Sequence, residues 1–102
     1  MLILTRKLGE RVRITVPDGY IWLTMLDGAI MCRDCGTEPL YASLGDAVYY
    51  DFEKGNETVE IRLLELRAPS SGHRIGIEAP KDWAILREEL IGKEAKPIVE
   101  IT

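Results

Sequence analysis

The chain has 102 residues, 46% of them hydrophobic and 29% charged, and its formal net charge is −4. A chain of this length forms one domain, and because a monomer so small buries only about 65% of its unfolded surface, a core shared with a second copy would stabilise it. No apolar run reaches about 18 residues, and the first basic residues follow the apolar ones, unlike a secretory signal; we therefore expect a cytoplasmic protein without a membrane partner.

The first part of the chain predicts two strands joined by a turn. Residues 2–7 are apolar at their start and cationic at their end, and they are rich in residue types that favour strands. Gly9 supplies the turn, and residues 10–16 then alternate between apolar and polar side chains, the period of a half-buried strand. Residues 1–14 hold four basic residues against one acid, a net charge of +3, so this is the basic part of the chain.

The middle of the chain is acidic and predicts an additional β-hairpin. Residues 15–56 hold seven acids against two basic residues, a net charge of −5. Within this stretch, residues 20–26 and 29–32 are apolar runs separated by an Asp-Gly pair, which is the strongest short-range signal for a hairpin. The acidic side chains of this stretch would repel phosphates if they lay near a nucleic-acid site.

The only cysteines, Cys32 and Cys35, form a C-x-x-C pair. Such a pair supplies half of the ligands of a structural zinc site, or forms a redox pair, or consists of two ordinary reduced thiols. We favour reduced thiols, because zinc would need further ligands from His73 or from the same pair of a second copy. His73 is the only histidine, and no activated nucleophile accompanies it in the sequence, so we expect it in an exposed loop.

The rest of the chain predicts one helical turn and three strands. A proline can open a helical turn over residues 40–44, and residues 47–52 have the composition of a short strand. Residues 58–66 alternate between apolar and polar side chains and predict a longer strand. Residues 74–78 alternate in the same way, and the proline that follows ends this strand because it lacks the backbone donor that a sheet needs.

Three motifs occur in a definite order: MLILTR at the start, IGIEAP at 75–80 and REEL at 87–90. This combination resembles the carbon storage regulator family of small RNA-binding translational regulators, known as CsrA or RsmA. The resemblance covers about half of the chain. It divides the single domain, residues 1–102, into the matching parts 1–14 and 57–91, an insertion at 15–56 and a tail at 92–102.

The resemblance implies a mainly β fold with a short C-terminal helix. The implied unit is a small antiparallel-sheet domain that forms an intertwined homodimer, with an inserted segment that contains a β-hairpin. Residues 83–90 have two readings. Apolar residues at helical spacing after Asp82 favour a single helix from Trp83. The family instead has a short strand at 83–86 followed by a helix, here at 87–91, and we follow the family.

The function implied by the resemblance is RNA binding. Family members bind single-stranded GGA in hairpin loops of mRNA leaders or small regulatory RNAs, and they repress translation initiation or alter mRNA stability; no DNA partner and no cofactor are implied. Each site lies where the first strand of one copy meets the last strand of the other. The residues that match it are Leu4, Thr5, Arg6 and Lys7 on the first strand and Ile85, Leu86 and Arg87 on the last.

These residue types suit the implied ligand. Unstacked guanines offer O6 and N7 acceptors, which exposed backbone donors at a strand edge can reach, while Arg6, Lys7 and Arg87 bind the phosphates. Arg87 is expected to matter most, because it is a long and permanently charged donor. A rival hypothesis is that the insertion binds a protein partner and makes the fold an antagonist, decoy or scaffold. The sequence predicts no enzyme, because it contains no nucleophile with a base, no acid-base carboxylate pair and no phosphate loop.

Overall fold

The computed structural model describes residues 1–17, 19–34, 37–52 and 57–91. Within these residues the chain forms nine strands and one 3-10 turn, so the predicted mainly β fold is confirmed. The elements are β1 (Leu2–Arg6), β2 (Arg11–Val16), β3 (Gly19–Leu26), β4 (Ala29–Asp34), β5 (Leu40–Ser43), β6 (Ala47–Phe52), β7 (Glu57–Glu65), β8 (His73–Glu78), β9 (Ile85–Arg87) and the 3-10 turn η1 (Glu88–Leu90).

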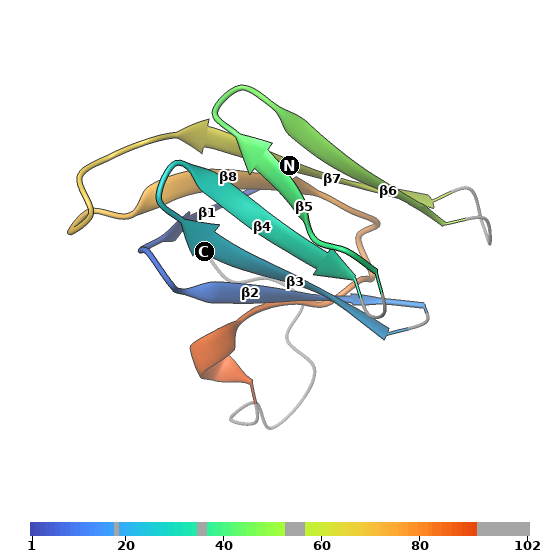
Figure 1. The fold of residues 1–102 in the computed structure, drawn as a ribbon. Coiled ribbons are helices and arrows are strands. Elements are labelled where there is room, and N and C mark those ends of the chain that lie inside the picture. The colour runs from blue at the N-terminus through green and yellow to red at the C-terminus, as the bar shows by residue number, and fades with distance from the viewer. Residues whose placement is uncertain (18, 35–36, 53–56, 92–102) are drawn as a thin grey trace.

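The strands form two antiparallel sheets that pack face to face (Figure 1). One sheet has the order β1-β8-β7-β6, and the other has the order β5-β4-β3-β2-β9. Alternate residues of each strand point inward, as the period of two requires, and one buried cluster contains residues from both sheets. Its largest fully buried side chains are Leu4, Val12, Ile14, Ile21, Leu23, Met25, Ile30, Val59, Ile61, Leu63, Ile75 and Ile77.

Two halves of the chain exchange their first strands. In the first half, β2, β3 and β4 pair in sequence, and in the second half β6, β7 and β8 do the same. The leading strand of each half joins the other half: β1 pairs with β8, and β5 pairs with β4. The two sheets are equivalent when β1, β2, β3 and β4 are matched with β5, β6, β7 and β8. This matching turns the order β1-β8-β7-β6 into β5-β4-β3-β2. The strand β9 is extra, and it covers the outer edge of β2.

A repeat in the sequence underlies this symmetry. The segments LTRKLGERV at 4–12 and LYASLGDAV at 40–48 share two leucines, a glycine, an acid and a valine at the same positions. Gly9 and Gly45 both have a positive φ, 83° and 87°, which glycine adopts without strain. Each glycine nitrogen donates to a carbonyl of the third strand of its half, at 2.7 Å from Gly9 and 3.4 Å from Gly45. The two turns are therefore equivalent.

The acidic middle of the chain belongs to this framework. The segment 15–56, predicted as an insertion, supplies β3 and β4, which form the hairpin expected around the Asp-Gly pair, together with β5 and β6. The helical turn predicted over residues 40–44 is wrong, because residues 40–43 form β5, Leu44 forms an isolated bridge with Leu63, and Ala42 is fully buried. Strand exchange takes place within one chain here, and the homodimer itself stays a prediction.

The end of the described chain is a strand followed by one tight turn. The strand β9 and the turn η1 rule out a single helix from Trp83, because Ile85 and Leu86 pair with β2. The predicted short C-terminal helix is a single 3-10 turn in the described part, and the tail at 92–102 lies outside the described residues. Nothing helical in the described residues is long and apolar enough to cross a membrane.

Candidate nucleic-acid interface

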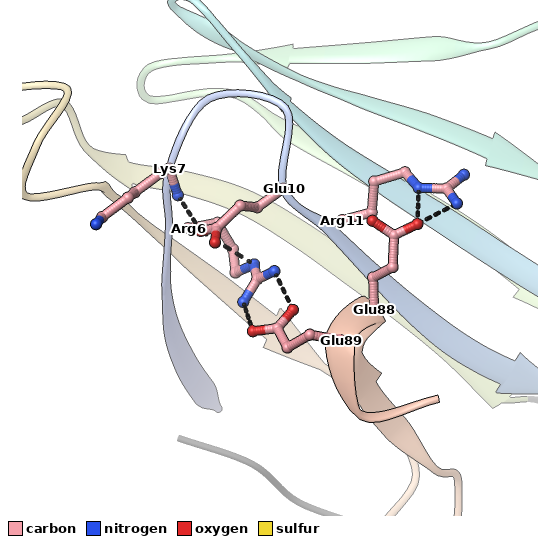
Figure 2. Close-up of polar contacts among 6 residues, drawn as sticks. All are labelled: Arg6, Lys7, Glu10, Arg11, Glu88 and Glu89. Carbon is pink, nitrogen blue, oxygen red and sulfur yellow. Dashed lines mark hydrogen bonds and ion pairs between the residues drawn. The ribbon is translucent and has the colours of Figure 1, made fainter. Parts of the chain in front are cut away.

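The first and last strands of the chain lie at the same side of the two sheets. β1 is an edge strand of one sheet and β9 is an edge strand of the other, and no described strand pairs with the outer side of either. Two hydrogen bonds from the Arg6 guanidinium to the Glu89 carboxylate, of 3.1 and 2.8 Å, join these edges (Figure 2). We call this junction of β1 with β9 and η1 the β1–β9 seam.

Arg6 is a buried structural residue of the seam. Its side chain is only 3% exposed, whereas that of Glu89 is 51% exposed. Besides the two hydrogen bonds to Glu89, its Nε lies 3.9 Å from a carboxylate oxygen of Glu10. The hydrogen bonds from Arg6 lower the pKa of Glu89 from 4.5 to about 2, although partial burial acts in the opposite direction. Glu89 therefore stays charged at neutral pH, and Arg6 is already engaged by carboxylates.

Arg87 points into the seam. It lies opposite Val12 in the β9–β2 pairing, and residues opposite one another project from the same face of a sheet. Because Val12 is buried in the core, Arg87 leaves β9 on its inner side, toward β1. The residue is half-buried, its buried Nε has no hydrogen-bond partner in the described structure, and its charge also lowers the pKa of Glu89.

The other predicted site residues divide into exposed and buried side chains. Thr5 and Lys7 are exposed, and the backbone nitrogen of Lys7 donates to a carboxylate oxygen of Glu10 at 2.7 Å. The buried ones are Leu4 (2% exposed), Ile85 (7%) and Leu86 (3%). The structure brings β1 and β9 together within one chain, whereas the resemblance implied a site between two copies. Leu4, Ile85 and Leu86 can offer a ligand only their backbone groups.

Sequence reasoning missed a row of arginines and aromatic rings on the outer face of β2 and β3. The guanidinium of Arg11 lies 4.2 Å from the ring centre of Trp22, and that of Arg13 lies 4.5 Å from the ring centre of Tyr20. Arg11 also forms a salt bridge with Glu88 of η1 (Figure 2). The alternation of 10–16 placed the two arginines on one face, but only the β2–β3 register shows which rings lie beside them.

A pocket of about 450 Å³ opens at the other end of the seam. It is lined by Leu2 of β1, Ile85 of β9, and Trp83, together with the segment 77–81. Its volume lies within the range of small-molecule sites, about 300–1,000 Å³. Its walls combine apolar side chains with the charged Glu78 and Lys81, and a carboxylate oxygen of Glu78 lies 3.3 Å from the N-terminal nitrogen of Met1. Thus the seam has the buried Arg6 at one end and a pocket with mixed apolar and charged walls at the other.

The remaining candidate residues are buried in the framework. The expectation that His73 lies in an exposed loop is wrong: it is 5% exposed on β8, and its Nδ1 accepts a hydrogen bond of 2.8 Å from the backbone nitrogen of Arg67. Cys32 is buried in the core, and this burial raises the pKa of its thiol to about 12, so the thiolate that binds zinc is disfavoured. Cys35 lies outside the described residues, and the described residues contain no group of three or more potential metal ligands.

Comparisons with known proteins were made at three levels. A scan against protein-family models found no matching family, and searches of curated proteins and of solved structures found no similar protein. The geometry of the seam and the motifs in the sequence are therefore the basis for assigning a function.

Proposed function

We propose that this chain is an RNA-binding regulator that takes single-stranded GGA into the β1–β9 seam. The observation that carries the proposal is that β1 and β9 are edge strands of the two sheets and that the Arg6–Glu89 hydrogen bonds join this side of the sheets. Each open edge offers unpaired backbone donors and acceptors. Single-stranded RNA exposes the base edges that such groups can read, whereas a duplex hides them.

Charge supports a site that selects bases more than phosphates. Arg6 is hydrogen-bonded to Glu89 and Arg11 to Glu88, so neither guanidinium is free for a phosphate. Among the predicted site residues, Lys7 is exposed and Arg87 is half-buried, and these two cations remain for the RNA backbone. Each phosphate contact with a single strand adds about 0.7 to the slope of log affinity against log salt. We therefore expect a shallow slope of about 1.4 and a strong dependence on the bases.

The motifs at the start and end of the chain support the biological role. Their resemblance to the carbon storage regulator family implies ligands in mRNA leaders or small regulatory RNAs, a cytoplasmic location and a homodimer. A protein that occupies GGA within a ribosome-binding site blocks translation initiation. Both strands that carry the resemblance lie at the seam, which is why we assign RNA binding there.

A second candidate function is a protein-interaction module without RNA affinity. The pairing of Arg6 and Arg11 with carboxylates favours it, because these ion pairs lower the positive potential of the seam. In this alternative the chain acts as an antagonist, decoy or scaffold for another regulator. An RNA-binding regulator should lose affinity when the bases of GGA are substituted, whereas an interaction module should not respond to the substitution.

The deciding experiment is a titration with RNA at a stated salt concentration. A hairpin RNA with GGA in its loop is compared with the same hairpin carrying CCA, using the wild type and the Arg87→Ala variant. We expect the wild type to prefer GGA, and Arg87→Ala to lose about tenfold or more in affinity for it. If the wild type binds both hairpins equally weakly, the interaction module replaces the regulator as the function.

A further inference from the structure

The outer edge of β6 is the uncovered counterpart of an edge that β9 covers. Strand exchange makes β2 and β6 equivalent, and β9 pairs with β2 along Val12 to Ile14. No described strand pairs with the outer side of β6. Of the two equivalent edges, the described chain covers that of β2 with β9 and provides no corresponding strand for that of β6. Among the described strands, none pairs with the backbone N–H and C=O groups along the outer edge of β6, and such groups can pair with another strand.

The other edge strands carry features that discourage pairing, and β6 carries few. β5 has four residues and follows Pro39, and β9 has three residues and is followed by two acids. β1 ends at the buried Arg6 and its carboxylate partner. β6 has six residues without proline or lysine, and its one charged residue is Asp51. Short strands, prolines and charges are the usual protection of sheet edges, so β6 is the least protected edge.

Exposed apolar side chains surround this edge. Four of the ten large exposed hydrophobic side chains in the described residues lie on β5, on β6 or in the turn between them: Leu40 (45% exposed), Tyr41 (55%), Leu44 (52%) and Tyr49 (52%). Figure 1 shows β5 and β6 together at the top of the view, away from the orange η1 turn of the seam at the bottom. The β5–β6 turn therefore lies apart from η1, whereas the last residue of β6 approaches the pocket of the seam, because the ring centres of Phe52 and Trp83 lie 5.1 Å apart.

We propose that β6 pairs antiparallel with β6 of a second copy of this chain, joining two four-stranded sheets into one of eight strands. A two-fold axis perpendicular to the sheet keeps both cores on one side, so opposed residues belong to the same face. Registers centred on Tyr49 or on Tyr50 meet this condition. The first places Asp51 opposite Ala47 of the copy, and the second places it opposite Tyr49. Neither opposes like charges, so the edge is complementary to itself.

This interface is separate from RNA binding and from the strand exchange within the chain. In the joined sheet the order begins and ends with β1, so the two seams lie at opposite ends and neither is covered. A pairing of two six-residue edges buries little surface compared with a standard interface of about 1,600 Å². The dimer is therefore weak and dissociates on dilution.

Sedimentation of the full chain over a range of concentrations tests the proposal. The wild type should move from the monomer mass of 11.5 kDa toward twice that mass as its concentration rises. Tyr49→Glu places a carboxylate opposite its own copy in one register and opposite Asp51 in the other, and should weaken the dimer about tenfold or more. Arg62 Nη2 donates to the Tyr49 hydroxyl at 3.2 Å, and glutamate keeps an acceptor for it, so the monomer should remain folded.

Two variants control for charge and for the lost hydroxyl. Tyr49→Phe keeps the ring and removes the hydroxyl, and it should dimerise like the wild type. Leu66→Glu adds the same charge at an exposed apolar residue outside β5 and β6, and it should also dimerise. If circular dichroism finds Tyr49→Glu unfolded, Ala47→Glu replaces it, since this residue faces Asp51 of the copy in the register centred on Tyr49.

Hydrogen exchange distinguishes a second copy from other occupants of the edge. The proposal expects the amides of β6 that face outward to exchange quickly in the dilute monomer and slowly in the concentrated protein. Equal protection at both concentrations would mean that the same chain protects the edge without a second copy, and the proposal would fall. A wild type of monomer mass at every concentration would also overturn the proposal. So would a dimer that remains intact in folded Tyr49→Glu or, where that variant is unfolded, in folded Ala47→Glu.

Discussion

The turn between β1 and β2 and the turn between β5 and β6 have the same backbone and opposite surface chemistry. Aligned by their spacing of 36 residues, Lys7 corresponds to Ser43 and Arg11 to Ala47. The first turn lies beside the β1–β9 seam, with its ion pairs, and the second beside an open strand edge with apolar side chains. The repeated framework therefore fixes where a surface lies, while the side chains decide what that surface can bind.

The largest predicted effect is on the free energy of unfolding, and it should come from the Arg6–Glu89 pair beside the first turn. Glu89→Ala leaves the buried guanidinium of Arg6 without its main partner, and we expect a loss of about 1.5–3 kcal/mol in the free energy of unfolding. Glu88→Ala breaks the pair with Arg11, in which both side chains are about 40% exposed, and should cost about 0–1 kcal/mol. Urea unfolding measures both, and equal losses would mean that Arg6 is not held by Glu89.

A second prediction tests whether the two surfaces act independently. Arg87→Ala should weaken binding to the GGA hairpin about tenfold and leave the dimer unchanged, because Arg87 points into the seam. Tyr49→Glu should weaken the dimer and leave RNA affinity per chain unchanged, because Tyr49 lies on the edge of β6. RNA titration and sedimentation of both variants provide the comparison. If one variant impairs both properties while still folded, the two surfaces are coupled.

The third prediction concerns acid stability, which the seam should dominate. Hydrogen bonds from Arg6 lower the pKa of Glu89 from 4.5 to about 2, so the folded state favours the charged carboxylate. This stabilisation is fully present above about pH 4.5 and is lost as the pH falls toward 2. Between pH 4.5 and 2, the urea concentration at the unfolding midpoint should fall less steeply with decreasing pH in Glu89→Gln than in the wild type. Parallel pH profiles for the two proteins would contradict this assignment.

The smallest predicted effect is on the salt dependence of RNA binding. Lys7→Ala should reduce the slope of log affinity against log salt by about 0.7, with a modest loss of affinity. Ser43→Lys adds a cation at the corresponding position of the other turn and should leave the slope unchanged, because charges beyond about 10 Å are screened at 0.1 M salt. A slope that rises with Ser43→Lys would place RNA at both turns.

Local patterns predicted most of the strands correctly. Alternation identified β2, β7 and β8, and the Asp-Gly pair identified the β3–β4 hairpin, because both signals depend on neighbours in the chain. The strand β5 was missed because its four residues follow a proline that also suits a helix start. Its identity depends on pairing with β4, and on Ala42 filling a buried position there.

The candidate site itself stays a prediction. The motifs drew attention to the two strands that lie at the seam, but the resemblance implied that these strands come from two copies, and in the structure they belong to one chain. The burial of Arg6 was not predictable, because its partner Glu89 lies 83 residues away. The repeat of 4–12 at 40–48 was present in the sequence, and a search for internal similarity could have found it.

The sequence by itself determined the strands, the tight turns at Gly9 and Gly45, and the basic character of the first residues. These features follow from side-chain alternation and from backbone preferences, which act over a few residues. Only the tertiary structure decided that β1 and β5 exchange places, that Arg6 is buried, and that β6 keeps an open edge. These outcomes depend on which distant strand competes successfully for each sheet edge, and that choice is made by packing across the whole chain.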